Sequence, residues 1–154
     1  MKSIALLLAV VITCSSLYAF DHTKLEQFKD KLATALTNKD LKALNLLYYT
    51  NGASQYEIDN DIYSYEYNFN HYAFDKIEIQ SLSDLKINSD AASIMTKGIT
   101  IYGHSYVPNL TPEALCTVMF IGKIKDRSVS AGSASPIGVD PDGNVKIILS
   151  KISN

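Results

Sequence analysis

The sequence predicts an α+β fold in which N-terminal helices pack on a curved, mainly antiparallel β-sheet. Two observations support this prediction. Apolar residues between positions 25 and 48 recur at intervals of three and four, which is typical of amphipathic helices. From residue 76 onward, short alternating or apolar runs are separated by Gly, Pro, Asn and Asp, which is typical of strands joined by turns. Helices first and strands later, in a chain of 154 residues, indicate a single α+β domain.

The first nineteen residues have the pattern of a signal peptide. Lys2 provides a basic start, and residues 4–12 form an unbroken apolar run of signal-peptide length that is too short to cross a bilayer. Leu17-Tyr18-Ala19 predicts cleavage after Ala19. We therefore expect residues 1–19 to direct export, to the periplasm or as a secreted protein, and residues 20–154 to form the domain.

Cys14 leaves a second destination open. Val11-Ile12-Thr13-Cys14 resembles a bacterial lipoprotein box, although Thr13 stands where Gly, Ala or Ser is usual. Acylation of Cys14 would anchor the protein to the cell envelope by a lipid, and only then do we expect the membrane to be a partner.

Two helices are predicted before residue 50. Asp21 or Thr23 can cap the first and Asp40 the second, and Asn51-Gly52 is a good stop because both residues tolerate a positive φ. The apolar positions of the first helix are Leu25, Phe28, Leu32 and Leu36. Those of the second are Leu41, Leu44, Leu47 and Tyr48.

The aromatic stretch 56–74 fits two periods. Tyr63, Tyr65 and Tyr67 alternate with polar residues as on a strand, whereas Ile58, Ile62 and Tyr65 are spaced as on a helix. Aromatic alternation favours a strand by propensity, but the length of the stretch favours a helix. We predict a helix over 54–70 and keep the strand as the alternative.

Beyond the aromatic stretch the chain predicts strands and turns. The strands are expected at 76–80, 99–102, 105–107, 114–121 and 145–152. Gly103-His104 is the expected hairpin turn, and 140–144 is a strong turn. Loops are expected at 83–93, 108–112 and 126–135. The apolar run 114–121 predicts a central strand covered on both faces.

Three local patterns carry a family resemblance: residues 38–44 (Asn-Lys-Asp-Leu-Lys-Ala-Leu), residues 106–110 (Tyr-Val-Pro-Asn-Leu), and Pro136-Ile137-Gly138 with Asp142-Gly143 before the last strand. With the order of elements over 22–152, they resemble the nuclear-transport-factor-like, cone-shaped α+β superfamily and its uncharacterised exported bacterial members. The resemblance implies a pocket in the cone. It implies no reaction, because the superfamily includes isomerases, dehydratases and non-catalytic binding modules.

The sequence lacks the residue patterns that several kinds of function require. The formal net charge is −2 and the Lys are scattered, so nucleic acid is not expected as a partner. We expect no cofactor and no metal. His22, His71 and His104 lack metal-site spacing, and the calcium-loop resemblance at 140–144 fails at later ligand positions. Cys116 lies in the apolar run, so a buried thiol is favoured over a nucleophile paired with His104.

These features favour a non-catalytic module that binds a small molecule or a protein, and they leave a homodimer open. No catalytic residue is assigned. The predicted binding surface comprises Tyr56, Tyr63, Tyr67, Tyr102, His104 and Tyr106. The alternative is an isomerase- or dehydratase-like enzyme that pairs a carboxylate with a Tyr hydroxyl. Its candidates are Asp59 or Asp61 beside Tyr63, with Tyr102 or Tyr106.

Overall fold

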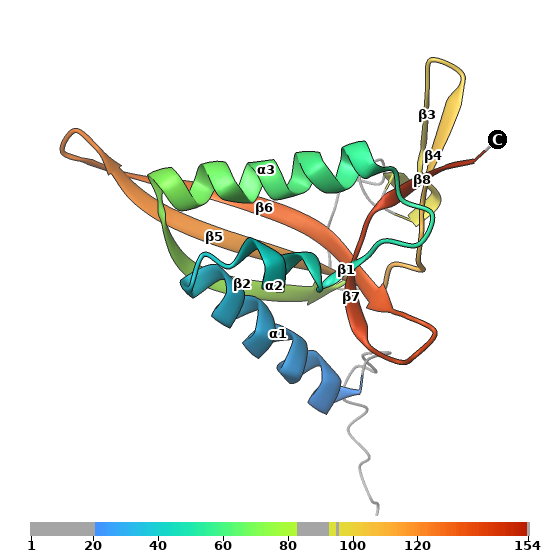
Figure 1. The fold of residues 1–154 in the computed structure, drawn as a ribbon, viewed down its shortest axis with the longest axis horizontal. Helices are drawn as coiled ribbons and strands as arrows, with labels where there is room; N and C mark the ends of the chain where they lie inside the picture. The colour runs from blue at the N-terminus through green and yellow to red at the C-terminus, as the bar shows by residue number, and fades with distance from the viewer. Residues whose placement is uncertain (1–20, 83–92, 95, 154) are drawn as a thin grey trace, which may run out of the picture.

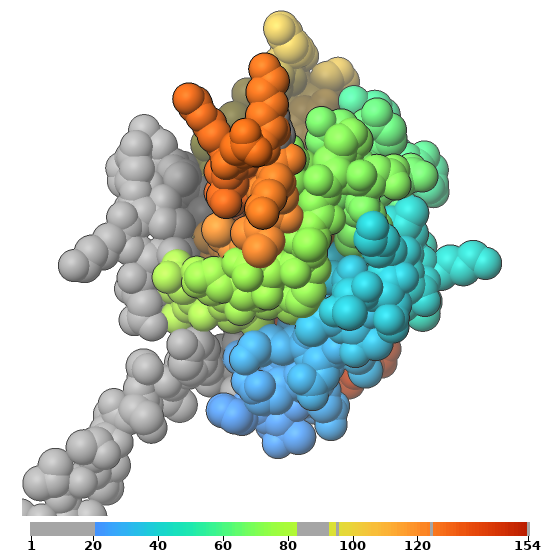
Figure 2. Space-filling model, turned by 90° about the vertical axis from the view of Figure 1, so that its left-hand side faces the viewer, coloured from blue at the N-terminus to red at the C-terminus, as the bar shows by residue number. Residues whose placement is uncertain are grey.

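A computed structural model describes residues 21–82, 93–94 and 96–153. The predicted leader 1–19, Cys14 and nearly all of the predicted loop 83–93 lie outside these residues. The described chain has the predicted α+β class, with N-terminal helices packed on a curved, largely antiparallel sheet (Figure 1). In Figure 2, which views the molecule from one end, α1 (blue), α2 (cyan) and α3 (green) lie next to one another from the bottom of the view up its right-hand side.

Three of the described helices begin at polar caps. They are α1 (His22–Thr37), α2 (Leu41–Asn45) and α3 (Gln55–His71). The carboxylate of Asp21 accepts a hydrogen bond from the Thr23 backbone N–H, and Asp40 accepts two from the first turn of α2. Ser54 caps α3 by accepting from the Glu57 N–H. The predicted helix over 54–70 is confirmed and the strand alternative is wrong.

The second helix is shorter than predicted. It ends at Asn45, and Tyr48 lies in strand β1 (Tyr48–Tyr49) rather than on a helix. Strand β1 runs parallel to β7 (Val145–Ile148), and the Leu47 carbonyl accepts a hydrogen bond of 2.9 Å from the Ile147 N–H. Pairing with a strand nearly one hundred residues away overrides the local helical spacing. The prediction that Asn51-Gly52 ends the second helix is therefore wrong, although Gly52 does adopt a positive φ, of 77°, in the turn after β1.

The strands of the described residues form two sheets. The larger has the order β1-β7-β6-β5-β2, with β2 (Ala73–Ser81), β5 (Ala114–Ile124) and β6 (Arg127–Val139). The smaller has the order β3-β4-β8, with β3 (Ile99–Ile101), β4 (His104–Pro108) and β8 (Ser150–Ser153). The β3–β4 turn is Tyr102-Gly103, both at positive φ, so it lies one residue earlier than predicted and His104 belongs to β4.

The predicted loop over 126–135 is wrong, because this segment forms most of β6. It pairs antiparallel with β5 along its whole length, from Ala114 opposite Ile137 to the turn at Lys125. Ser, Ala and Gly have low strand propensity, but cross-strand pairing outweighs it. One of the small side chains of β6, Ser133, hydrogen-bonds the buried Tyr65 of α3.

The prediction that 114–121 is covered on both faces is also wrong. Strand β5 is an interior strand, between β6 and β2. Its even-numbered side chains face the helices and are buried: Ala114, Cys116, Val118 and Phe120. On the other face Leu115 and Met119 are only half-buried, and Ile121 is 48% exposed. The aromatic rings of Tyr65, Phe69 and Phe74 surround Phe120 at 6.2–6.4 Å between centroids.

The predicted last strand is two strands in different sheets. The break is at the buried Leu149, whose N–H donates to the side-chain oxygen of Asn109 at 3.1 Å. The Asn109 amide group donates in turn to the backbone carbonyls of Tyr49 and Asn51. Asn109 is 9% exposed, so one buried side chain joins three segments where the chain leaves one sheet for the other.

We predict that Asn109→Ala lowers the free energy of unfolding by about 3 kcal/mol, because each buried polar group left unpaired costs about 1–3 kcal/mol. Urea denaturation followed by circular dichroism measures this change. The exposed Asn70→Ala is the control and should change stability little. An equal effect of the two substitutions would show that the Asn109 hydrogen bonds do not hold the junction.

Candidate functional site

A cavity of about 440 Å³ lies where the two sheets diverge. It is bordered by the start of α3, the Ala134–Pro136 part of β6, the β7–β8 junction and the β3–β4 hairpin. Figure 1 shows the beginning of α3 and the hairpin at the same end of the molecule. Its apolar walls include Ile99, Pro108, Ile148 and Leu149. Its polar groups include Tyr56, Glu57, Asn60, Asp61, Tyr106 and Ser150.

Two carboxyl groups of α3 share this cavity. Glu57 and Asp61 are four residues apart, so they lie one above the other on one helix face. Burial raises the pKa of both groups above the usual range. For Glu57, hydrogen bonds from Ser150 and the Ser54 backbone lower the pKa, and the Asp61 charge raises it. Among the described residues, no Lys, Arg or His lines this cavity.

Tyr48 holds Asp61 in place. Its hydroxyl donates a hydrogen bond of 2.9 Å to Oδ2 of Asp61, and this bond lowers the pKa of Asp61 against the larger effect of burial. Burial also raises the pKa of Tyr48 far above its usual range, so this hydroxyl keeps its proton. No described residue donates to the other oxygen, Oδ1. The carboxyl group is therefore fixed in orientation with one oxygen left for a ligand.

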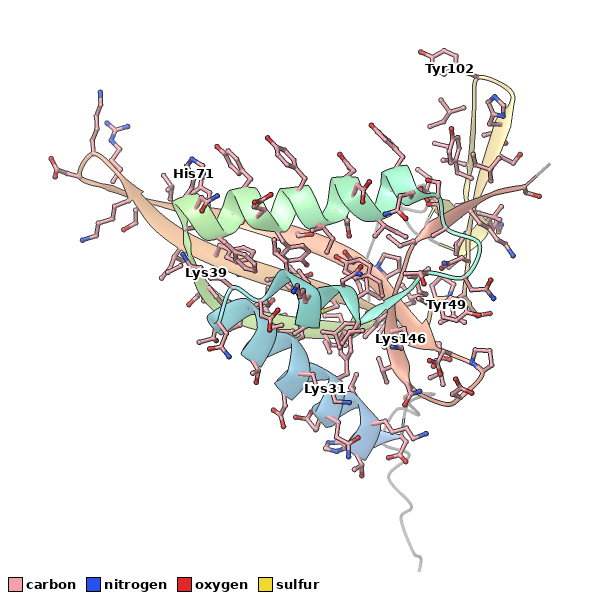
Figure 3. The ribbon with its side chains drawn as sticks, viewed as in Figure 1. Lys31, Lys39, Tyr49, His71, Tyr102 and Lys146 are labelled. Atoms are coloured by element: carbon pink, nitrogen blue, oxygen red, sulfur yellow. The ribbon has the colours of Figure 1, made fainter. Side chains whose placement is uncertain are left out.

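The six residues predicted as a binding surface lie in three places. Tyr56 and Tyr106 line the cavity. Tyr63 and Tyr67 project from the outer side of α3, where 66% and 49% of their surface is exposed. Tyr102, with 98% of its surface exposed, occupies the tip of the β3–β4 hairpin beside His104 (Figure 3). The structure thus brings two of the six together.

The residues weighed for an enzyme separate in a similar way. Asp61 and Tyr106 line the same cavity. Asp59 is exposed and accepts a hydrogen bond from Gln55, and it does not line the cavity. Sequence reasoning missed Glu57, Tyr48 and Ser150. The four-residue spacing of Glu57 and Asp61 was a usable signal, but nothing local connects Tyr48 or Ser150 to α3.

Cys116 is buried in the core of the larger sheet, and burial raises the pKa of its thiol to about 12. His104 is exposed in the smaller sheet, so the two do not form a nucleophilic pair. In the described ranges, no three His, Cys, Asp or Glu side chains lie close enough to share a metal ion. The Asp140 carboxylate accepts from the Asp142 and Asn144 N–H groups, which confirms the predicted turn.

Comparisons with known proteins do not place the chain in a family. No family model matches it, and no curated protein matches it. Its fold is similar to that of the helical cell shape determining protein Pgp2 from Campylobacter jejuni, with a TM-score of 0.40 and 11% sequence identity. The match covers 80% of this chain and 38% of the Pgp2 chain. None of the described helices is long and apolar enough to cross a membrane.

We predict that Asp61→Asn changes how stability depends on pH. A carboxyl group whose pKa is raised on folding stabilises the fold below its unfolded pKa, and this contribution is lost as pH rises through the folded pKa. Asn at this position still accepts the Tyr48 hydrogen bond but does not titrate. The free energy of unfolding of Asp61→Asn should therefore rise relative to the unchanged protein as pH increases from acid to neutral.

Urea titrations across this pH range measure the difference. The exposed Asp59→Asn on the same helix is the control and should give a smaller change. A difference for Asp61→Asn that stays constant with pH would contradict burial as the cause.

Proposed function

We propose that the chain is a non-catalytic binding module that holds a small organic ligand with a positively charged amino group. The observation that carries this proposal is the presence of two carboxyl groups, Glu57 and Asp61, in a cavity whose described lining has no basic residue. The cavity volume of about 440 Å³ lies within the range usual for small-molecule sites.

The charge balance of the cavity favours a cation. A carboxylate that loses water without gaining a positive partner is destabilised, which is why burial raises the pKa of both groups. An ammonium group between Glu57 and Asp61 would restore the lost interaction through charge-assisted hydrogen bonds. Because Tyr48 already orients Asp61, little ordering would be needed on binding.

The apolar and aromatic lining supports the rest of the ligand. Ile99, Ile148 and Leu149 provide surface for a hydrocarbon body. Tyr56 and Tyr106 line the same cavity, and tyrosine ring faces attract cations. A cavity beside a curved sheet is also what the cone-shaped superfamily resemblance implies. The proposal includes export, which rests on the leader sequence alone.

A second candidate is an enzyme that moves a proton within this cavity. It is favoured by Asp61, a carboxyl group with a raised pKa that shares the cavity with Tyr106. Against it, the Tyr48 hydroxyl already donates its hydrogen bond to Asp61, so it is not free to donate to a substrate. Exchange of carbon-bound hydrogen for deuterium from D₂O, followed by NMR for a panel of small ketones, separates the two. Only an enzyme would accelerate exchange, and Asp61→Asn would abolish it.

We predict that phenethylamine binds more tightly than its neutral analogue of similar shape, 2-phenylethanol. Titration followed by NMR chemical shifts measures both affinities. The preference should shrink about tenfold or more in Asp61→Asn, because a hydrogen bond to a charged group contributes about 1.5–3 kcal/mol. Amine affinity should also weaken as pH falls through the raised pKa values of Glu57 and Asp61, because protonation removes their charge.

Glu66→Gln is the matched control, since it removes a carboxylate from α3 outside the cavity. Glu57→Gln preserves the capping interaction at the start of the helix and tests the second carboxyl group. Equal binding of the amine and the alcohol, or an equal loss in Glu66→Gln, would overturn the proposed site.

A further inference from the structure

A row of tyrosines runs along the outer side of α3, away from the core. Tyr56, Tyr63 and Tyr67 are separated by seven and four residues, so they lie within about 40° of one another around the helix. Their exposed fractions are 78%, 66% and 49%. Tyr56, at the start of the row, also borders the cavity. Figure 3 shows ring side chains rising from this side of α3, with His71 at its end. Tyr67 stacks on His71, with ring centroids 4.1 Å apart.

Exposed carboxylates border this row on one flank. Asp59 and Glu66 are seven residues apart and both are exposed, so they follow the tyrosines along the helix. The sequence of α3 contains four acidic residues and neither Lys nor Arg. The outer face therefore combines large ring surfaces with uncompensated negative charge.

We propose that the outer face of α3, formed by Asp59, Tyr63, Glu66 and Tyr67, is a docking surface for a basic protein segment. Its Lys and Arg side chains would lie across the tyrosine rings and pair with the two carboxylates. Tyr and Arg are enriched at the centres of protein interfaces, where rings bury area with little loss of side-chain entropy. A second copy of the chain that docks through the same face fits less well, because this face has no Lys or Arg to pair with the carboxylates of the other copy.

The surface is separate from the proposed ligand site. None of its four residues lines the cavity, whereas Glu57 and Asp61 lie on a different side of the helix. Substitutions on the outer face therefore test docking without removing the groups proposed to hold a small molecule.

The test uses a fluorescently labelled octa-arginine peptide and fluorescence anisotropy at low salt. We expect binding to the unchanged protein that weakens as salt is added, because exposed charges are screened. The double variant Tyr63→Ala/Tyr67→Ala should lose affinity about tenfold, whereas Tyr63→Phe/Tyr67→Phe, which keeps both rings, should retain it. Asp59→Asn/Glu66→Gln should also lose affinity about tenfold.

Matched controls separate this surface from overall charge. Asp126→Asn/Asp142→Asn makes the same charge change in exposed turns away from α3, and Tyr102→Ala removes a ring with 98% exposure elsewhere. Both controls should bind octa-arginine as the unchanged protein does. Equal losses in the controls, unaltered binding by the Tyr63→Ala/Tyr67→Ala variant, or no binding at all would each overturn the proposal.

Two further outcomes would assign the face to another occupant and overturn the proposal as well. One is self-association in sedimentation velocity that the Tyr63→Ala/Tyr67→Ala variant abolishes, which would indicate a second copy of the chain. The other is tyrosine-dependent binding of chitotetraose, a neutral oligosaccharide, without binding of octa-arginine.

Discussion

The arrangement of the two sheets depends on the buried side-chain amide of Asn109, which stabilises the junction between β7 and β8. Its oxygen accepts from the Leu149 N–H, while its amide group donates to the carbonyls of Tyr49 and Asn51. The Asn109 backbone N–H also donates to the Leu149 carbonyl, at 2.9 Å. These bonds pair backbone groups that the break between β7 and β8 would otherwise leave unsatisfied in the interior. The chain can therefore pass from the larger sheet to the smaller one at Leu149. Leu149 and its neighbour Ser150 line the cavity, so the cavity lies beside this junction.

Helix α3 presents similar side chains to three different surroundings. Tyr65 and Phe69 face inward and pack around Phe120. Glu57 and Asp61 face the cavity, and the row containing Tyr63 faces solvent. Successive helical residues are separated by about 100°, so one segment can serve a core, a cavity and an outer surface at once. Beneath α3, Ser133 of β6 hydrogen-bonds the inward-facing Tyr65.

The two proposals share an electrostatic cause. Helix α3 carries four carboxyl groups and no Lys or Arg, and the cavity that it borders has no basic lining residue among those described. Where the carboxyl groups are partly buried, burial raises their pKa and a small cation would be the fitting ligand. Where they are exposed beside tyrosine rings, a basic protein segment would fit. Both proposed partners are positively charged. The cavity suits a small ligand and the outer face of α3 suits a protein segment because the two sites differ in burial and shape.

The sequence by itself determined the features that depend on neighbouring residues. The caps Asp21 and Asp40, the helical period of α1 and α3 and the turn at 140–144 all follow from local hydrogen bonding and apolar spacing. Only the tertiary structure decided what depends on distant partners. Cross-strand pairing turned the Ser- and Ala-rich segment 126–135 into a strand, and pairing with β7 placed Tyr48 in a strand rather than in a helix. The cavity likewise joins Glu57 to Ser150, which lie 93 residues apart in the chain. No local pattern encodes that contact, because the free energy that forms it comes from packing the two sheets and α3 together.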